Sequence, residues 1–566
     1  MALLVTLISP LAGQRTTRPS LSDANIDEIA TLLKLEDTRQ FDEAVLTRLV
    51  ASRHPEVKRR AIVSVGRIVN EKGRTLLATL HGETDPELLA TVAFATGQLK
   101  DPAAVAWLSD LLNDPKTPPV AAREAAQALG KMPAMNVPAA EARAALSKYL
   151  LAAAPSPATA PVIGEALLSM GRFLTPGDIA PMVRWSTAAD VEVRWRAAWA
   201  LFRLKDPAGI PHLMTMSANA SPDVRFWAVR GLAPALVDQS TVKRPDAAAR
   251  LRQAVNDPDR RVRTEALRAL TAYDDDASFE TVMSALSASD TWLSVSAAEA
   301  VGRFQSRAAL VAPALVAASG ESKPLSVRLS ALTPLVTLSP EAGRALATAL
   351  AKSPSATAQA AATQALRQLD AAAARAAAEA AGTAPAVAAG RGGNAAGGAR
   401  GTGPARPALV ARSDADYRSL VTTWIVPDYN GEPHPHVLFT TARGDVDVEL
   451  YPGDAPFGVE YLMKVIESGD IVNTEFGRVV PNFVAQQRAI RNDGTLRDEV
   501  NRHGLLRGTL SWASSGLDTG RPGYTLGSTP QPHNEGNFTA LGRVAKGLEV
   551  VDRLELGDKI TGAKRR

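Results

Sequence analysis

Residues 257–270 read DPDRRVRTEALRAL, the clearest copy of a pattern that decides the fold of most of the chain. Asp257 before Pro258 predicts a helix start, because an aspartate side chain can cap the first turn and proline needs no N–H partner there. Apolar residues then recur three or four positions apart from Val262 to Leu270, so one face of the helix is apolar. The stretch therefore predicts an amphipathic helix with one buried stripe.

The same pattern recurs along the chain at the spacing of a helical repeat. Ser221 begins a copy 36 residues before Asp257, and Asp190 begins another 31 residues before Ser221. Further copies begin at His54-Pro55 and Asp85-Pro86. Such a period is typical of stacked helix pairs, and the signature resembles HEAT repeats in their short bacterial form. We therefore expect an all-α HEAT-like solenoid over residues 27–381, whose concave face binds client or partner proteins.

Three copies carry an arginine at the same place, namely Arg194, Arg225 and Arg263. Stacked repeats contact their neighbours, so we expect each arginine to pair with a carboxylate of the adjacent repeat rather than to hold a ligand. The tryptophans between Trp107 and Trp292 are likewise expected to pack between helices.

The composition agrees with stacked helices and excludes several kinds of chemistry. The chain has 566 residues, of which 46% are hydrophobic but only 5% aromatic, so Ala, Leu and Val supply most of the apolar surface. A net charge of +4 over this length gives no sign of nucleic-acid binding, and no nucleic-acid partner is expected. The chain has no cysteine, which excludes disulfides, thiolate nucleophiles and thiolate-bound zinc.

The chain starts with an apolar stretch, Ala2–Gly13, followed by the polar residues Gln14 and Arg15. This stretch resembles the core and cleavage region of a secretory signal, although it lacks a positive start. We expect residues 1–20 to be a signal segment and the protein to be exported to a bacterial periplasm or another extracytoplasmic compartment; a cytoplasmic location is the alternative. No later stretch is long and apolar enough to span a bilayer, so no transmembrane segment is expected.

A second change of composition follows the repeats. Residues 382–412 are rich in Ala and Gly with few apolar anchors, which predicts a flexible linker that tethers the C-terminal domain. The glycines of this segment lack a preceding strand and a following Gly-Lys-Ser/Thr, so they do not predict a phosphate-binding loop.

Beyond the linker, residues 413–566 show the period of β-strands. Apolar and polar residues alternate over Asp445–Leu450, which predicts a half-buried strand. Ala455-Pro456 opens a predicted helix that ends before Gly469. Further short apolar runs lie at 475–480, 483–486, 508–513 and 539–544. Many short strands with few helices predict a mainly-β closed barrel.

Four segments of this region, in this order and spacing, resemble cyclophilin-type peptidyl-prolyl cis-trans isomerases. They are TTARGDVDVELYPGDAP (440–456), FGRVVPNFVAQ (476–486), RGTLSWA (507–513) and LGRVAKGLEVVD (541–552). The resemblance implies an eight-stranded, cyclophilin-like barrel capped by helices, with a proline-binding groove on its outside. It also implies the activity of an isomerase, or rotamase, that assists protein folding.

Prolyl isomerisation requires no nucleophile, metal or redox cofactor. Rotation about an X–Pro bond is slow because the amide has partial double-bond character, with a barrier of about 18–20 kcal/mol. A fixed cation that donates to the prolyl nitrogen weakens this conjugation, and a hydrogen bond to the preceding carbonyl holds one half of the bond still. We expect no cofactor and no metal, since the H-x-H pair of His434 and His436 has no evident third ligand.

The resemblance carries over to individual residues. Arg478 matches the catalytic arginine of the family, and Gln486 matches the glutamine that orients the substrate carbonyl. The predicted substrate-binding residues are Phe483 and Val484 on the floor of the proline pocket, Leu541 on its apolar wall, Ser514 through its backbone, and His533.

Several positions depart from the family pattern, and the more serious departures are two in the wall of the groove. Gly523 and Thr525 stand where the family has a glutamine and a phenylalanine that line the groove. The chain is therefore predicted to be either an isomerase with one eroded wall or a non-catalytic scaffold that binds proline-containing segments through a degenerate cyclophilin domain. In both cases the expected substrate or ligand is a proline-containing protein or peptide.

Overall fold

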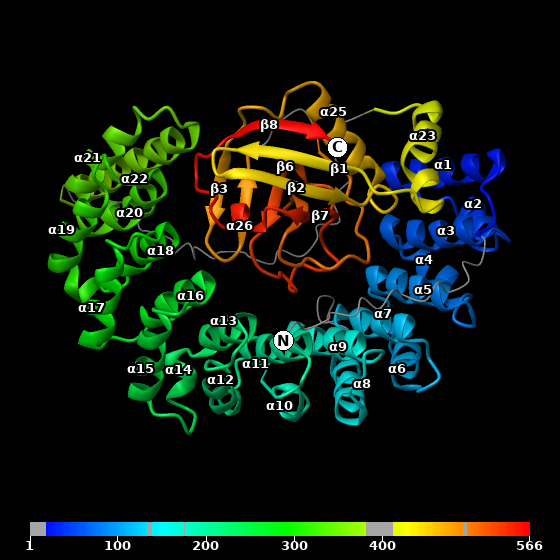
Figure 1. Cartoon of the computed structure of the whole chain (residues 1–566), viewed down its shortest axis with the longest axis horizontal. Helices are drawn as coiled ribbons and strands as arrows, with labels where there is room; N and C mark the ends of the chain where they lie inside the picture. Colours follow the sequence, from blue (N-terminus) through cyan, green and yellow to red (C-terminus); the bar gives the residue numbers. More distant parts are fainter. Residues whose placement is uncertain (1–17, 133–138, 175, 381–410, 489, 491–494) are drawn as a thin grey trace, which may run out of the picture.

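The computed structural model describes residues 18–132, 139–174, 176–380, 411–488, 490 and 495–566. Within this part, helices form a curved array that surrounds a strand domain (Figure 1). The stretch Ala2–Gly13 and nearly all of the predicted linker lie outside the described residues, so export and linker flexibility stay predictions. Among the described helices, none combines the length and the apolar character needed to cross a membrane.

The array consists of two layers of helices, as the repeats predict. The inner helices pack against one another in succession: α1 (Asp23–Thr38), α3 (Pro55–Ile68), α5 (Pro86–Leu99), α7 (Pro119–Leu129), α9 (Ala160–Arg172), α11 (Val191–Leu204), α13 (Pro222–Gly231), α16 (Arg260–Leu270), α18 (Thr291–Val301), α20 (Leu325–Leu338) and α22 (Ala356–Ala380). The outer layer contains α2 (Glu43–Val50), α4 (Lys72–Ala78), α6 (Val105–Asn113), α8 (Ala139–Ala152), α10 (Ala180–Trp185), α12 (Ile210–Met216), α14 (Pro234–Val237), α15 (Arg244–Ala254), α17 (Asp276–Ala285), α19 (Ala308–Ala318) and α21 (Pro340–Leu350). Short 3₁₀ turns are η1 (Pro102–Ala104), η3 (Pro207–Gly209) and η4 (Gln305–Arg307).

Helix starts follow the predicted capping chemistry, with one shift at the quoted repeat. In α5, the side chain of Asp85 caps the helix and accepts hydrogen bonds from the first free backbone N–H groups. In α16, the capping residue is Asp259, so the helix begins at Arg260 rather than at Pro258 as the sequence predicts. The Asp257 carboxylate lies just before this capping residue, where it accepts from the backbone N–H of Asp259 and pairs with Arg225 of the preceding repeat.

The repeat arginines join neighbouring repeats. Arg225 pairs with Asp257 of the next repeat, with 2.7 Å between Nε and Oδ2, and Arg263 pairs likewise with Asp290. These two pairings confirm the prediction of a structural role. Arg194 differs, since it donates to the backbone carbonyl of Ala188, just before its own helix.

The strand domain contains eight strands that pair in antiparallel fashion. They are β1 (His436–Thr441), β2 (Gly444–Leu450), β3 (Phe476–Val480), β4 (Val484–Gln487), β5 (Thr509–Ala513), β6 (Arg521–Gly527), β7 (Ala540–Lys546) and β8 (Ile560–Arg565). Their order across the sheet is β3-β4-β6-β5-β7-β2-β1-β8. The helical elements of this domain are α23 (Asp414–Leu420), the π-helical η5 (Val421–Ile425), α24 (Val426–Tyr429), α25 (Pro456–Glu467) and α26 (Leu548–Val551).

The sheet is curled like a half-barrel and does not show the continuous closure that the sequence predicts. Its two edge strands are β3 and β8, and they share no ladder in the described residues. The edges meet only near one bridge, between Glu475 and Lys559, and a few adjacent backbone hydrogen bonds. From Ile560 onward β8 follows β1 instead, which leaves most of β3 without a partner on that side.

The concave face of the solenoid is filled by the strand domain of the same chain (Figure 1). At the end of α1, Arg39 donates two hydrogen bonds to Asp518, at 2.8 Å and 2.6 Å, and both side chains are less than 10% exposed. Arg67 of α3 donates to backbone carbonyls of the strand domain, including that of Val500 at 3.0 Å. The concave surface expected to receive a partner is thus covered, and the strand domain is docked rather than only tethered.

A second buried charge cluster joins the domains at the middle of the array. Arg172 of α9 lies between Glu165 of the same helix and Glu535 of the strand domain, at 3.0 Å and 2.9 Å. Burial and the neighbouring Glu165 carboxylate raise the pKa of Glu535 from its ordinary 4.5 to about 7. One arginine therefore serves two carboxyl groups from different domains.

Replacing Arg39 with methionine is expected to lower the free energy of unfolding by about 3 kcal/mol, because Asp518 keeps a buried charge without its main partner. Urea unfolding followed by fluorescence measures the change. The matched control is Lys72→Met, which breaks an ion pair whose side chains are each 67% exposed and should change stability by less than about 1 kcal/mol. Equal effects of the two substitutions would contradict the docking role of Arg39.

The raised pKa of Glu535 predicts that the folded state loses stability as the pH rises. In the unfolded chain this carboxyl ionises near its ordinary pKa of 4.5, whereas in the folded chain it holds its proton up to about pH 7. The stabilisation is complete below about pH 4.5 and is lost as the pH rises through 7. Melting temperatures of wild type and Glu535→Gln should therefore converge below about pH 4.5, diverge progressively up to about pH 7 and stay apart above it. Curves that are parallel over this whole range would refute the assignment.

Candidate functional site

The predicted catalytic residues lie on one β-hairpin, formed by β3 and β4. Arg478 in β3 is the antiparallel partner of Gln486 in β4, and opposed residues send their side chains to the same face of a sheet. The Arg478 guanidinium accordingly donates to the amide oxygen of Gln486 across 3.3 Å. Asn482 closes the turn with a φ of 61°. The hairpin thus places a cation and an amide side by side.

Arg478 has no carboxylate partner among the described residues. Partial burial lowers its pKa from the ordinary 12.5, but a guanidinium stays charged throughout the physiological range. Its central carbon lies 5.4 Å from the centroid of the Phe483 ring. The site therefore holds a charged donor whose hydrogen-bonding capacity is not taken up by an anion.

An open groove of about 670 Å³, which we call the Arg478 groove, lies in front of Arg478 and Gln486. Ser514 and Gly523 line it on the side of the strand domain, and α22 of the solenoid lines it at another side. Gly523 supplies no side chain to that wall. The other departure, Thr525, has its hydroxyl bonded to that of Ser511 at 2.8 Å.

The remaining predicted residues do not line this groove. Phe483 and His533 lie beside each other, with ring centroids 6.2 Å apart, in a neighbouring cleft that we call the Phe483 cleft. Val484 is buried and lines neither space. Leu541 is completely buried against Gly458 of α25, in the core of the strand domain. Leu541 cannot form the apolar wall predicted for it, because β7 lies inside the sheet and this side chain faces the core.

Arginine side chains surround His533 in the Phe483 cleft. Loss of water around the His533 ring, together with the charges of Arg203, Arg230 and Arg172, lowers the pKa of this histidine to about 4. The imidazole is therefore neutral near pH 7 although part of the side chain is exposed.

The tip of the hairpin is fixed by the solenoid. The Asn482 amide donates to the carbonyl of Arg261 at 2.8 Å and to the Glu265 carboxylate at 2.9 Å, both from α16. Arg268 of the same helix donates to the Pro481 carbonyl at 2.9 Å. Asn482 is 3% exposed, so these contacts are shielded from water. Helix α16 thus holds the turn from which Arg478 and Gln486 extend.

The sequence did not reveal this anchor. A Pro-Asn pair between two strands is a turn signal, so the left-handed turn at Asn482 could have been inferred. The role of Glu265 could not, because it contacts a residue 217 positions away.

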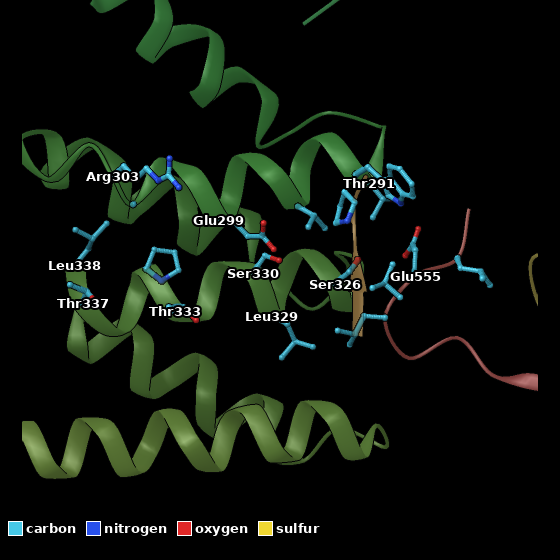
Figure 2. Close-up of a pocket in the computed structure, with 18 residues that line it drawn as sticks. Thr291, Glu299, Arg303, Ser326, Leu329, Ser330, Thr333, Thr337, Leu338 and Glu555 are labelled. Carbon is cyan, nitrogen blue, oxygen red and sulfur yellow. The ribbon is translucent and has the colours of Figure 1, made fainter. Parts of the chain in front are cut away.

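A third, partly open pocket lies on the other side of the hairpin tip, between α18, α20 and the strand domain. Its volume is about 520 Å³. Figure 2 shows Thr291 and Glu299 of α18 facing the row Ser326–Thr337 of α20, with Glu555 at one end. Neither Arg478 nor Gln486 lines this pocket, so it is not the predicted catalytic site.

The histidine pair of the sequence is engaged in local contacts. His434 contacts Asp428 at 2.7 Å and Glu449 at 3.0 Å, and His436 contacts Asp447 at 2.7 Å. In the described part of the chain, no group of three or more histidine or carboxylate side chains is arranged to hold a metal ion.

The family profile described as "Cyclophilin type peptidyl-prolyl cis-trans isomerase/CLD" matches residues 436–565, and a profile of HEAT repeats matches five overlapping segments within residues 43–335. A peptidyl-prolyl cis-trans isomerase of Synechococcus elongatus is 31% identical over 135 residues, which make up 22% of this chain and 93% of the relative. Peptidyl-prolyl cis-trans isomerase B of Bacillus subtilis is 35% identical over 121 residues, 20% of this chain and 85% of the relative.

Among solved structures, a cyclophilin type peptidyl-prolyl cis-trans isomerase of Cryptosporidium parvum matches with 21% identity and a TM-score of 0.23, covering 24% of this chain and 98% of that one. The sequence comparisons match the strand domain that carries the hairpin, and the helical repeats precede it. The chain therefore belongs to the cyclophilin-type peptidyl-prolyl cis-trans isomerase family, with HEAT repeats ahead of its cyclophilin domain.

Proposed function

We propose that the chain isomerises prolyl bonds of a polypeptide client in the Arg478 groove. The observation that carries this proposal is the pairing of Arg478, a charged donor without an anion, with the adjacent Gln486 amide. In the proposed reaction Arg478 donates to the prolyl nitrogen as it becomes pyramidal, which weakens the amide conjugation. Gln486 holds the carbonyl of the preceding residue, and the proline ring packs on Phe483.

The eroded wall should affect binding more than the chemical step. Gly523 and Thr525 do not lie at the reacting bond in this scheme, whereas Arg478 does. Loss of contacts that hold the ground state and the transition state equally raises KM without lowering kcat. We therefore propose that the domain binds short peptides weakly. Protein clients would gain affinity from contacts outside the groove.

The second candidate is a scaffold that binds proline-containing segments without isomerising their prolyl bonds. The absence of a side chain at Gly523 favours it, because the groove then has one wall fewer to immobilise the substrate. The two candidates differ in one measurement, since a scaffold leaves the isomerisation rate of a bound peptide at its uncatalysed value.

Replacing Arg478 with alanine should lower kcat/KM for an Ala-Pro peptide by about 10²- to 10³-fold, the usual cost of removing one preorganised donor from a transition state. A protease-coupled assay with the full chain measures the rate. Arg543→Ala is the matched control, because this exposed arginine lies on β7 outside the groove. Equal rates in wild type and Arg478→Ala, both at the uncatalysed level, would refute the enzyme and leave the scaffold.

Replacing Asn482 with glycine should lower kcat by about tenfold and change KM little. Glycine keeps the left-handed turn but removes the two hydrogen bonds to α16, so the hairpin is less firmly held while the groove keeps its lining. Steady-state kinetics separate the two constants. An unchanged kcat would show that α16 does not position the catalytic hairpin.

A further inference from the structure

The Phe483 cleft is built jointly by the two domains. On one side lie Phe483 and His533 of the strand domain, and on the other lie Trp227 and Arg230 of α13 together with residues of α16. The cleft has a volume of about 300 Å³ and is partly open. A polypeptide that enters it would contact the solenoid and the strand domain at once.

Phe483, which lines the cleft, also lies close to Arg478, which lines the Arg478 groove. The central carbon of the Arg478 guanidinium lies 5.4 Å from the centroid of the Phe483 ring. The centroid of the His533 ring lies 6.2 Å from the same point. An extended chain advances by about 3.3–3.6 Å per residue. When a prolyl ring lies against Phe483, a residue one or two positions away therefore falls within the cleft.

The cleft carries more positive than negative charge. Arg230 and Arg268 share the single carboxylate of Glu265, at 3.6 Å and 3.1 Å, and Arg268 is also 3.6 Å from the half-exposed Glu299. Arg203 has no ion pair among the described residues, and its Nε atom is buried without a hydrogen-bond partner. After the loss of water, the charges of Arg203, Arg230 and Arg172 also contribute to lowering the pKa of the nearby His533.

The Arg230 guanidinium is held in place by two aromatic rings. It lies 5.5 Å from the ring of Trp227 and 5.2 Å from that of Phe202, and these aromatic faces fix its direction. The Arg230 side chain is still 40% exposed, and its contact to Glu265 is longer than a hydrogen bond. The group is therefore positioned and only partly neutralised, because it shares Glu265 with Arg268.

We propose that the Phe483 cleft is an extension of the substrate site in which Arg230 pairs with an aspartate or glutamate one or two residues from the client proline. The solenoid then selects clients by charge in addition to holding the catalytic hairpin. This inference rests on the proposed function only in placing the proline on Phe483. Clients with lysine at these positions are disfavoured, because like charges meet in a partly enclosed space.

The test uses three fluorescein-labelled peptides of sequence Xaa-Ala-Pro-Xaa, where Xaa is Glu, Gln or Lys. Anisotropy with the full chain measures Kd, and exchange NMR measures the cis/trans rate. The Glu peptide should bind about three- to fivefold more tightly than the Gln peptide, and the Lys peptide less tightly. The preference for Glu should shrink at 1 M salt, where charges are screened within about 3 Å.

Arg230→Gln should remove the difference between Glu and Gln peptides, whereas Arg344→Gln should keep it. Arg344 lies on the distant α21 and pairs with Asp370 of α22. Equal affinities of the three peptides for wild type, or an unchanged preference in Arg230→Gln, would overturn the inference. If the preference is present but no peptide is isomerised, the charge-selecting cleft stands and the proposed catalysis fails. The two proposals therefore fail through different measurements.

Discussion

The rest of the structure depends on charged groups that are removed from water where the two domains meet. Arg39 with Asp518, and Arg172 with Glu535, each join a solenoid helix to the strand domain, and a buried ion that loses its partner costs far more than the pair gains. These contacts stabilise one relative position of the domains against all others. The solenoid and the strand domain are therefore docked through buried contacts.

The docking of the two domains affects both the concave face of the solenoid and the hairpin of the strand domain. A solenoid with an empty concave face would offer it to a partner, but here that face holds the hairpin of β3 and β4 through Asn482 and Glu265. In the proposed reaction, Arg478 and Gln486 extend from a turn whose position is set by another domain, and α13 forms one side of the substrate path. On that proposal, client recognition and catalysis are coupled through a shared wall, and movement of the solenoid would alter both at once.

Much of the fold followed from local patterns. The repeat motif predicted stacked helix pairs, and alternation predicted β2, while the helix from Ala455-Pro456 to the residues before Gly469 matches α25. Two strands, β6 and β8, were not predicted, because their sequences RPGYTLG and ITGAKR contain glycine and polar residues and lack clear alternation. Their extended form depends on neighbouring strands, which supply the hydrogen bonds that the local sequence does not specify.

For the site, the sequence by itself determined the kinds of group and their place on one hairpin, since Arg478 and Gln486 are eight positions apart across a turn. Only the tertiary structure decided that Leu541 faces the core, that Phe483 opens toward α13, and that the concave face is occupied. The physical reason is distance along the chain. Contacts such as that of Glu265 with Asn482 join residues 217 positions apart. A local sequence pattern therefore does not predict which buried charged group pairs with which partner.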